Sequence, residues 1–534
     1  MNHYDAIIIG AGFSGLYQLH FLRENLGLNV KILETADNVG GTWFWNRYPG
    51  SRCDTESKAY TYYFSKELYE DWNWSERYPT QPEIEKYLNY VCDKLDLRKD
   101  IEFQTKVTDL IYDNERKTWT TLTNNKEKFS SKFIISAVGC LSYANMPVIP
   151  NKNKFQGEIY HTGDWPKIEP ELANKNIGII GTGSTGIQVI PEVAKLAKKL
   201  TVFQRTPNYS VPANNYKLTQ NQKNQANIDF HKSKKLMFQH RGGHPWTHSH
   251  ISAKATEVTK RNALYEKAWA NGGLSFRDTF SDLSIDADSN LTASQFIINK
   301  IKKIIKNPDT AAMLTDFDHP FGSKRPPIDT NYYETFNRKN VDLINIRKDP
   351  IKSFKTNGIT TEKNDYELEV LIFATGFDAL TGTLLNMNII GDNNISLKNI
   401  WQTGPKTNLG LLVPNFPNLF LITGPGSPAV LTNMPRAIEQ HVEWIGNCIK
   451  YMLKNDYDSI QTTVEAADDW TENVQEAVKD NFFLSAKHSW YLGGNIPGKP
   501  KIFIPYAGGL NKYREICDLV AQNDYKGCIF TKTT

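Results

Sequence analysis

A strand, a glycine turn of the form GxGxxG and a helix follow one another twice in this 534-residue chain. The apolar strands are expected at 4–9 and 176–180, about 170 residues apart. The turn glycines are Gly10, Gly12 and Gly15 in the first copy, and Gly181, Gly183 and Gly186 in the second. Such glycines allow a tight turn, a close approach of a pyrophosphate to the backbone, and close packing of the helix on the strand. The repeat predicts an α/β chain with two dinucleotide-binding units.

The first unit carries an acidic residue where a dinucleotide site needs one. Val30–Leu33 is predicted to form the next strand, and Glu34 ends it, 24 residues after Gly10. A carboxylate at this position can accept a hydrogen bond from a ribose hydroxyl. Since strand, helix and acid all fall in the expected order, we interpret the unit as a nucleotide site rather than a plain tight turn.

The second unit ends its next strand (LTVFQRTP) with Arg205 and Thr206 instead of an acid. An arginine there can pair with a ribose 2′-phosphate, which favours NADP over NAD, although a solvated arginine after a strand is the alternative. Two dinucleotide folds imply two dinucleotides, and FAD with NADPH is the economical pair. Hydride would then move from the nicotinamide to the flavin.

Between the two turns lie two stretches with unusual composition. Residues 40–54, GGTWFWNRYPGSRCD, are rich in glycine and aromatic rings and have no amphipathic period. Flat rings beside a nucleotide suit the wall of an isoalloxazine, whereas a packed aromatic loop with a surface arginine is the alternative. Residues 155–166, FQGEIYHTGDWP, form the linker before the second turn.

Both stretches match family fingerprints in full. The linker fits F-x-G-x3-H-x3-W-P, and the aromatic loop fits [AG]-G-x-W-x4-[FY]-P-G-x3-D. Together they resemble the fingerprints of type I Baeyer–Villiger monooxygenases, the family of phenylacetone and cyclohexanone monooxygenases. The resemblance continues through 324–338, 373–382, 424–444 and 489–510, and so covers essentially the whole chain.

The resemblance implies an FAD-containing, NADPH-dependent enzyme that converts ketones to esters or lactones with molecular oxygen, through a C4a-peroxyflavin. It also implies two Rossmann-like domains, for FAD and NADP, with a helical insertion. The expected division is 1–142 and 380–534 for the two parts of the FAD domain, 153–213 and 321–379 for the two parts of the NADP domain, and 214–320 for the insertion.

The resemblance also assigns roles to individual residues. Arg325 is expected to be the active-site cation beside developing anions, because arginine stays protonated, and Asp54 to orient it. Lys324 and Arg205 are expected to hold the 2′-phosphate. His161 is given a hinge or relay role in the linker rather than proton transfer to substrate, and an ordinary structural histidine is the alternative.

Further residues follow from the same motifs. At the FAD side we expect Gly10, Gly12, Phe13, Ser14, Gly15, Glu34, Gly41, Thr42, Trp43, Arg52, Asp54, Tyr60, Val107 and Met434. At the NADP side we expect Thr182, Gly183, Ser184, Thr185, Gly186, Gln188, Arg205, Thr206, Lys324, Arg325 and the mobile-loop Trp490. Ala429, Val430 and Leu431 are expected to line the ketone pocket. Without the resemblance, Trp490 and Met434 would be read as core and Lys324 as a solvated charge.

Composition narrows the partners. A net charge of +4 over this length is nearly balanced and gives no reason to expect nucleic acid or an acidic membrane surface. No apolar run approaches the roughly 18 residues of a membrane helix. The six cysteines show no CxxC pair or metal spacing, so reduced thiols in the cytoplasm are expected. A ketone and oxygen are the expected partners.

Three segments needed separate interpretation. In HRGGHPWTHSH (240–250) the glycines and proline rule out one helix and no acidic residue interleaves, so a loop is predicted and no metal site. IINKIKKIIK (297–306) is predicted to be an amphipathic helix with a solvated basic face. The chain is expected to end in a strand at 501–509 and a helix at 513–522.

Three other functions fit parts of the sequence. A related N- or S-oxygenating flavin monooxygenase usually lacks the Trp-Pro ending of the linker. A disulfide reductase needs a redox cysteine pair after the first turn, where Cys53 stands alone. A binding protein that holds both cofactors without turnover would not need Arg325 and Asp54. The substrate stays open among linear, cyclic and aromatic ketones; the loop GPGSPAVLTNM hints at aryl or branched ones.

Overall fold

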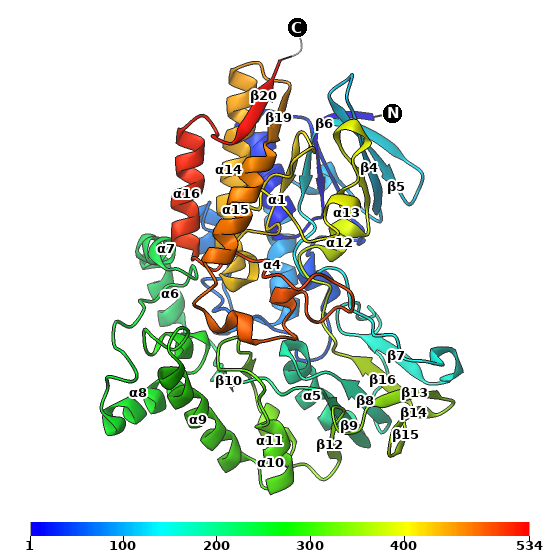
Figure 1. Cartoon of the computed structure of the whole chain (residues 1–534), viewed down its shortest axis with the longest axis vertical. Helices are drawn as coiled ribbons and strands as arrows, with labels where there is room; N and C mark the ends of the chain where they lie inside the picture. The colour runs from blue at the N-terminus through cyan, green and yellow to red at the C-terminus, as the bar shows by residue number, and fades with distance from the viewer. Residues whose placement is uncertain (1, 533–534) are drawn as a thin grey trace.

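The computed structural model describes residues 2–532 and contains two main sheets, one above the other in Figure 1. The upper sheet has the order β17-β4-β5-β6-β1-β2-β3, with β18 beside β6. Its strands are β1 (Asn2–Ile9), β2 (Val30–Leu33), β3 (Ile101–Glu102), β4 (Val107–Asp113), β5 (Thr118–Thr123), β6 (Lys128–Ser136), β17 (Asn388–Ile390) and β18 (Leu419–Leu421). Strands from both ends of the chain therefore share one sheet, as the expected discontinuous FAD domain requires.

The lower sheet is parallel throughout, in the order β12-β9-β8-β16-β7. Its strands are β7 (Glu158–His161), β8 (Asn176–Ile180), β9 (Lys199–Gln204), β12 (Val341–Asn345) and β16 (Val370–Phe373). A helix, α5 (Ser184–Leu196), packs on one face, and the small sheet of β13 (Ile351–Lys355), β14 (Gly358–Thr361) and β15 (Asp365–Glu367) supplies the apolar cover of the other. Both faces are buried, which explains the short all-apolar strands.

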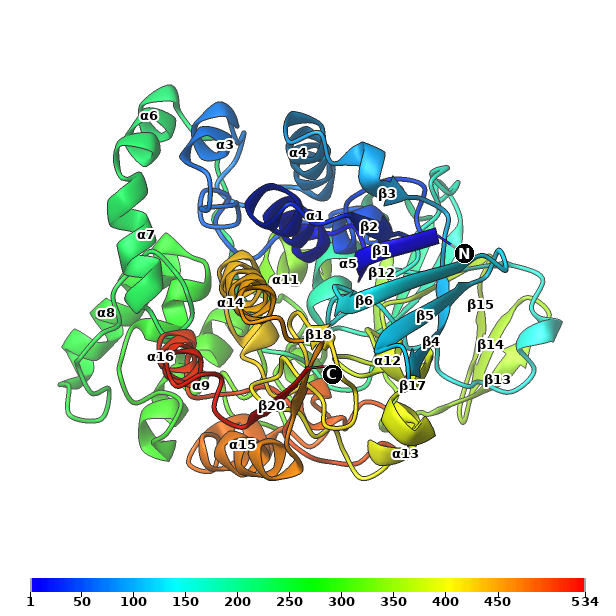
Figure 2. The same cartoon turned by 90° about the horizontal axis from the view of Figure 1, so that it is seen from above.

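Helices α1 (Phe13–His20), α4 (Gln81–Lys94) and α14 (Met434–Lys454) contribute to the largest core cluster, on one side of the upper sheet. Figure 2 shows α1 and α14 side by side, and Gly446 of α14 allows this because a Cβ there would enter the ring of Phe21. The other side of the sheet packs on α13 (Leu397–Ile400) and on Trp401, Val413 and Phe416 in the segment that follows it.

The segment between the paired strands β10 (Val211–Pro212) and β11 (Ile328–Asp329) is helical, as predicted. It contains α6 (Gln220–Ile228), α7 (Phe230–Gln239), α8 (Val258–Asn271), η4 (Leu274–Asp278), α9 (Ala287–Ile304) and α10 (Pro308–Leu314), drawn in green in Figure 1. Ile297 and Ile301 of α9 are buried in the lower core, so its basic residues lie on the solvent side. No helix within residues 2–532 has the length and apolar character to cross a membrane.

The remaining short elements lie in connections and at the C-terminal end. They are η1 (Phe21–Asn25), α2 (Thr42–Trp45), α3 (Lys66–Asp71), η2 (Arg98–Asp100), η3 (Lys152–Lys154), α11 (Tyr332–Thr335), α12 (Gly382–Leu385), η5 (Asp392–Asn394), η6 (Ala429–Leu431), β19 (Ser459–Thr462), α15 (Val464–Glu476), η7 (Phe482–Ser485), η8 (Trp490–Leu492), α16 (Leu510–Gln522) and β20 (Cys528–Thr531). The exact domain limits given above stay predictions.

One predicted element is wrong. Residues 501–509 form no strand, although the helix expected after them is present as α16. The segment makes only scattered backbone bonds, in which Ile504 N donates to Tyr491 O and Tyr506 N to Ser427 O. Residues 503–507 are buried in an unbroken run against two different loops instead of a neighbouring strand, so the apolar composition of the segment reflected burial and not strand pairing.

The two glycine turns have the same construction. Gly10 (φ +103°) follows its strand directly and lies against the backbone carbonyl of Ala137, at the end of a neighbouring strand. Gly181 (φ +115°) lies against the carbonyl of Ala374 in the same way. A Cβ on the third glycine would overlap the carbonyl oxygen of the first, in Gly186 as in Gly15. A Cβ on Gly183, in contrast, meets nothing within 4 Å.

We therefore predict opposite phenotypes for two alanine substitutions in the second turn. Gly186→Ala forces α5 away from β8 and costs about 1–3 kcal/mol of stability, as overpacking does. Gly183→Ala keeps the melting temperature but weakens NADP binding, because its methyl group blocks the approach of a pyrophosphate. Thermal unfolding without NADP and titration with NADP measure the two effects. Equal melting temperatures for both variants would contradict the packing account.

Candidate active site at the junction of the two nucleotide units

The first glycine turn presents free donors beside a fixed carboxylate. Helix α1 has no side-chain cap, so the N–H groups of its first turn are open to an anion. Glu34 is buried and accepts hydrogen bonds from Ala11 N (2.6 Å) and Ala36 N (2.7 Å). Burial raises the pKa of Glu34, while these backbone bonds work in the opposite direction. Donor set and carboxylate fit a dinucleotide.

The aromatic loop packs directly on this turn. Gly41 has φ +54°, and a Cβ there would lie 2.9 Å from the Cα of Gly12. Trp43 is buried and its Nε1 donates to the hydroxyl of Tyr60 at 3.1 Å. This narrow approach leaves a cradle between backbone and flat rings, the shape that a flavin ring needs. The loop then delivers Asp54 to the junction with the lower sheet.

The spacing of residues in the linker has a local explanation. A Cβ on Gly157 would overlap both the ring of Phe155 and the carbonyl of Glu369. A Cβ on Gly163 would lie 2.6 Å from the ring of Phe377. Trp165 N donates to Trp45 O at 3.3 Å, so the end of the linker is tied to the aromatic loop. The two fingerprints therefore meet in space.

His161 is held as a neutral imidazole. Its Nδ1 accepts from Gly163 N at 2.9 Å, and its Nε2 lies 3.3 Å from the hydroxyl of Thr375. That hydroxyl already donates to Asn145 O (2.6 Å), so it must accept the proton on Nε2. Burial lowers the pKa of His161, and a second ring proton would face the N–H of Gly163. The relay or hinge role stays a prediction.

Arg325 and Asp54 form a two-pronged ion pair, as predicted for neighbours. Arg325 Nε lies 2.6 Å from Asp54 Oδ2, and Nη2 lies 2.8 Å from Oδ1. The remaining Nη1 donates to Val430 O at 3.1 Å. Burial opposes the charge of Arg325, but Asp54 outweighs it and raises the pKa, so the cation persists at every accessible pH.

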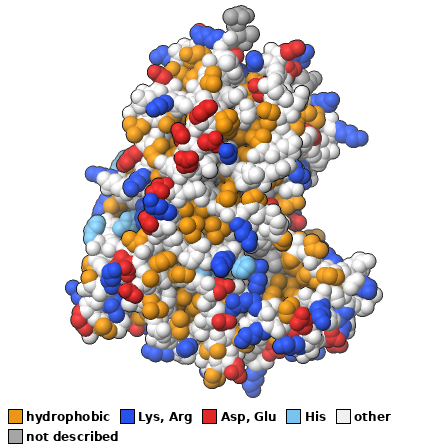
Figure 3. Space-filling view, in the orientation of Figure 1, with side chains coloured by type: hydrophobic (Ala, Val, Ile, Leu, Met, Phe, Trp, Pro, Cys, Tyr) orange, Lys and Arg blue, Asp and Glu red, His pale blue; other side chains and the backbone are white. Residues whose placement is uncertain are grey.

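Lys324 lies within electrostatic range of Arg205 and Arg347. Burial and these neighbouring charges lower the pKa of Lys324, and Asp318 acts in the opposite direction. Arg347 was missed in the sequence because no spacing links it to the turn; it binds Asp316 at 2.7 Å and lies 3.6 Å from Asp318. Lysine and arginine side chains gather beside the indentation in the lower half of Figure 3.

Gln188, which is expected to contact a cofactor, forms hydrogen bonds with other residues of the protein. Its Oε1 accepts from Tyr48 OH at 2.8 Å and from Arg52 N at 3.4 Å, and its Nε2 donates to Arg52 O at 3.0 Å. Arg52 in turn pairs with Glu76. The side chain thus joins α5 to the aromatic loop; contact with a cofactor stays a prediction.

The other predicted site residues are distributed as follows. Ser184 and Thr185 stand at the uncapped start of α5, and Thr182 donates to Thr206 O. Val107 is buried in the core at the start of β4, Met434 begins α14, and Trp490 begins η8 against the ring of Tyr491. Ala429, Val430 and Leu431 form η6, where Val430 touches Arg325.

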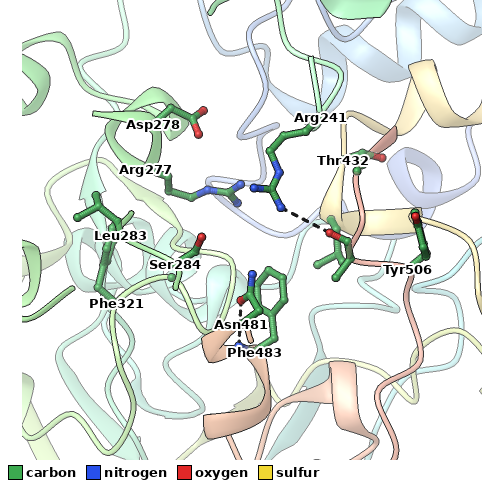
Figure 4. Close-up of a pocket in the computed structure, with 15 residues that line it drawn as sticks. Arg241, Arg277, Asp278, Leu283, Ser284, Phe321, Thr432, Asn481, Phe483 and Tyr506 are labelled. Carbon is green, nitrogen blue, oxygen red and sulfur yellow. Dashed lines mark hydrogen bonds between the residues drawn. The ribbon is translucent and has the colours of Figure 1, made fainter. Parts of the chain in front are cut away.

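A cavity of about 90 Å³ opens beside η6. Its walls come from the insertion and from the C-terminal loops, and two arginines that the sequence did not single out point into it (Figure 4). The residues that shape it here are Arg241, Arg277, Leu431, Thr432, Asn481 and Tyr506. Arginine in a helical insertion carries no motif, so only the fold could reveal these two.

The histidine segment is a loop, as predicted, but its acidic partner comes from elsewhere. Asp278 of η4 lies 3.1 Å from His248 Nδ1 and 3.7 Å from His240 Nε2. The three groups are close enough to hold a metal ion. The two imidazoles stack at 3.9 Å and 21°, however, and Trp246 Nε1 donates to the carboxylate at 2.8 Å. The arrangement is a hydrogen-bonded stack around Asp278. The acidic residue lies outside the histidine segment, so the composition of residues 240–250 could not reveal it.

Comparison with known proteins identifies the family. Residues 4–214 match the FMO-like model, described as flavin-binding monooxygenase-like. The chain is 40% identical to cyclohexanone 1,2-monooxygenase of Acinetobacter sp (98% of this chain, 96% of the relative) and to a Baeyer–Villiger monooxygenase of Pseudooceanicola batsensis (99% and 97%). This chain belongs to the Baeyer–Villiger monooxygenases. It is also 40% identical to phenazine N-monooxygenase of Lysobacter antibioticus (99% and 97%).

The fold is that of solved family members. The closed crystal structure of cyclohexanone monooxygenase superposes with a TM-score of 0.97 at 38% identity, covering 100% of both chains. This Baeyer–Villiger monooxygenase thus has the two Rossmann-like units expected for FAD and NADP, and it is a flavin- and NADPH-dependent enzyme.

The neutral state of His161 predicts a specific acid sensitivity. Its pKa is lowered in the folded state, so its contribution is complete above the unfolded pKa of about 6.5 and is lost as pH falls below it, by up to about 1.4 kcal/mol per pH unit. His161→Asn keeps the acceptor for Gly163 N but cannot titrate. The variant should therefore lose less thermal stability than wild type between pH 7.5 and 5.5.

The exposed His250 provides the control, since His250→Asn removes an imidazole at the surface. It should follow the wild-type pH dependence. Identical pH profiles for His161→Asn and wild type would show that folding does not lower the pKa of His161.

Proposed function

We propose that this enzyme oxidises ketones to esters or lactones, consuming one O₂ and one NADPH and releasing water and NADP⁺. The observation that carries the proposal is the bidentate Arg325–Asp54 pair, whose arginine also binds the backbone of η6. It provides a permanent cation at the junction of the two nucleotide units. When bound, FAD accepts hydride from NADPH and activates oxygen.

The residues of this chain would supply position and electrostatics. Arg325 stabilises negative charge that develops on the carbonyl oxygen, and in a site closed to water such preorganised charge is worth the most. Asp54 accepts two hydrogen bonds from the guanidinium and so fixes its plane, and a lysine could not donate two bonds in the same geometry. Ala429, Val430 and Leu431 would form the apolar side of the ketone pocket.

Lys324 and Arg205 would bind the 2′-phosphate of NADPH, with Thr206 beside them. The support is their mutual electrostatic contact next to the second glycine turn and their incomplete neutralisation by Asp318. A phosphate placed among these cations would relieve the repulsion that now lowers the pKa of Lys324.

N-oxygenation is the second candidate, because a phenazine N-monooxygenase is 40% identical over 99% of this chain. A single assay separates the two: cyclohexanone and phenazine are offered to the same holoenzyme, and the products are identified by mass spectrometry.

We also place the enzyme in the cytoplasm, because all six cysteines are free thiols: Cys53, Cys92, Cys140, Cys448, Cys517 and Cys528.

Arg325→Ala should bind FAD but lose ester formation by at least about a hundredfold, the effect of removing one preorganised donor. Protein-bound flavin absorbance after desalting and product formation from cyclohexanone are the two measurements. Arg325→Lys should recover a small part of the activity, because it restores the positive charge but not the two parallel hydrogen bonds to Asp54. Wild-type ester formation in the alanine variant would remove Arg325 from the mechanism.

Arg205→Ala combined with Lys324→Ala should lower kcat/KM for NADPH by about a hundredfold or more and leave that for NADH nearly unchanged, since two charge-assisted contacts to the 2′-phosphate are lost. The double variant Arg338→Ala, Lys339→Ala removes the same charge from an exposed site and is the matched control. A parallel loss with both nucleotides would contradict the 2′-phosphate assignment.

A further inference from the structure

The cavity beside η6 contains an unpaired pair of cations. Arg241 follows the end of α7, and Arg277 belongs to η4. Figure 4 shows their guanidinium groups turned toward one another in the open space. Among residues 2–532, the guanidinium group of Arg277 has no hydrogen-bond or ion-pair partner within ordinary distance limits, and that of Arg241 makes one long hydrogen bond, to Ala507 O at 3.5 Å. Two like charges that face each other this way repel unless an anion lies between them.

The adjacent carboxylate does not neutralise them. Asp278 faces the histidine loop, where it accepts from Trp246 Nε1 at 2.8 Å and contacts His248 at 3.1 Å. Burial, and the charges of Arg325 and Arg241, lower the pKa of Arg277; Asp278 only partly opposes this. Two guanidinium groups and one carboxylate line the cavity, so it keeps a net positive charge.

The other polar groups of the wall can donate hydrogen bonds. Asn481 uses its Oδ1 to accept from Phe483 N at 3.2 Å, which leaves its NH₂ group for the cavity. In Figure 4 this nitrogen points toward the two guanidiniums. The hydroxyls of Ser284 and Tyr506 also line the space. Guanidinium, amide and hydroxyl donors around one small volume are the chemistry that recognises a carboxylate.

The cavity adjoins the proposed reaction site. Leu431 and Thr432, which line it, directly follow Val430, whose carbonyl accepts from Arg325. Tyr491 is buried and in electrostatic contact with both Arg325 and Arg277. A volume of about 90 Å³ lies below the roughly 300–1,000 Å³ of a complete small-molecule pocket, so it suits a head group and not a whole ketone.

We propose that the substrate of this enzyme is a ketone that carries a carboxylate, which Arg277 and Arg241 bind while its carbonyl lies at Arg325. The inference deepens the proposed ketone oxidation and rests on it. The alternative anion is a phosphate of NADP. The cluster that holds Lys324 and Arg205 already provides a phosphate site and does not include Arg277. The cations of this cavity are therefore left for the substrate.

The test compares two ketones of equal shape, 4-oxocyclohexane-1-carboxylate and its carboxamide, with the FAD-loaded enzyme. Wild type should show a kcat/KM about tenfold or more higher for the carboxylate. Arg277→Met keeps the length and apolar stem of the side chain, and the ratio of the two kcat/KM values should fall about ten- to hundredfold, mainly through KM, as expected for a lost charge-assisted bond. Arg277→Lys should keep part of the preference.

Calorimetry gives a readout without turnover. Oxidised holoenzyme with NADP⁺ should bind the carboxylate more tightly than the carboxamide, and Arg277→Met should remove the difference. The control is Arg338→Met, which removes the same charge from an exposed arginine. It should retain the wild-type ratio, because the effect requires a charge in the cavity and not a change in net charge.

The outcomes separate the two proposals. Equal kcat/KM for both ketones in wild type, with lactone formed from each, would overturn the carboxylate site and leave ketone oxidation standing. NADPH oxidation without lactone from either ketone, or from cyclohexanone, would overturn the proposed function itself. A rise in the KM for NADPH in Arg277→Met equal to that in the Arg205 and Lys324 double variant would assign the arginine to the cofactor and also overturn the carboxylate site.

Discussion

The ion pair between Arg325 and Asp54 joins the two nucleotide units at the place where their ligands must meet. The two residues are 271 positions apart and are both half-buried, and a third donor of the arginine binds Val430 O. Loss of one partner would leave the other charge unpaired at this junction. One guanidinium thus connects three segments: the aromatic loop, the segment before β11 and the loop of η6.

Three groups of cations in this enzyme differ in how they are compensated. Arg325 is fully paired and so acts as a fixed charge. Lys324 and Arg205 are opposed only in part by Asp318, as suits a site that receives a dianionic phosphate. Arg277 and Arg241 face each other and form no salt bridge, and the one carboxylate that lines their cavity, Asp278, makes its short contacts with the histidine loop. How far acidic groups neutralise a cation, more than the mere presence of a basic residue, indicates which cation is available to bind a ligand.

Much of the fold could be predicted because its signals are local. Each glycine turn places its three glycines within six residues, and a Cβ on the third would meet the carbonyl oxygen of the first. The strands of the lower sheet are short apolar runs since both faces are buried. The same logic failed at 501–509, where an apolar run is buried between two loops without a neighbouring strand.

The sequence alone determined the two nucleotide turns, the two fingerprints and the position of Arg205 at a strand end, since each depends on residue type at a fixed spacing. The candidates Arg325, Asp54 and Lys324 came from the family resemblance that the fingerprints carry. Only the tertiary structure decided that Asp278 completes the histidine stack and that Arg277 faces Arg241 beside Asn481. Such groups come from separate segments and meet through helix packing. Packing constrains side-chain volume and burial but leaves no periodic trace of which charges will be neighbours.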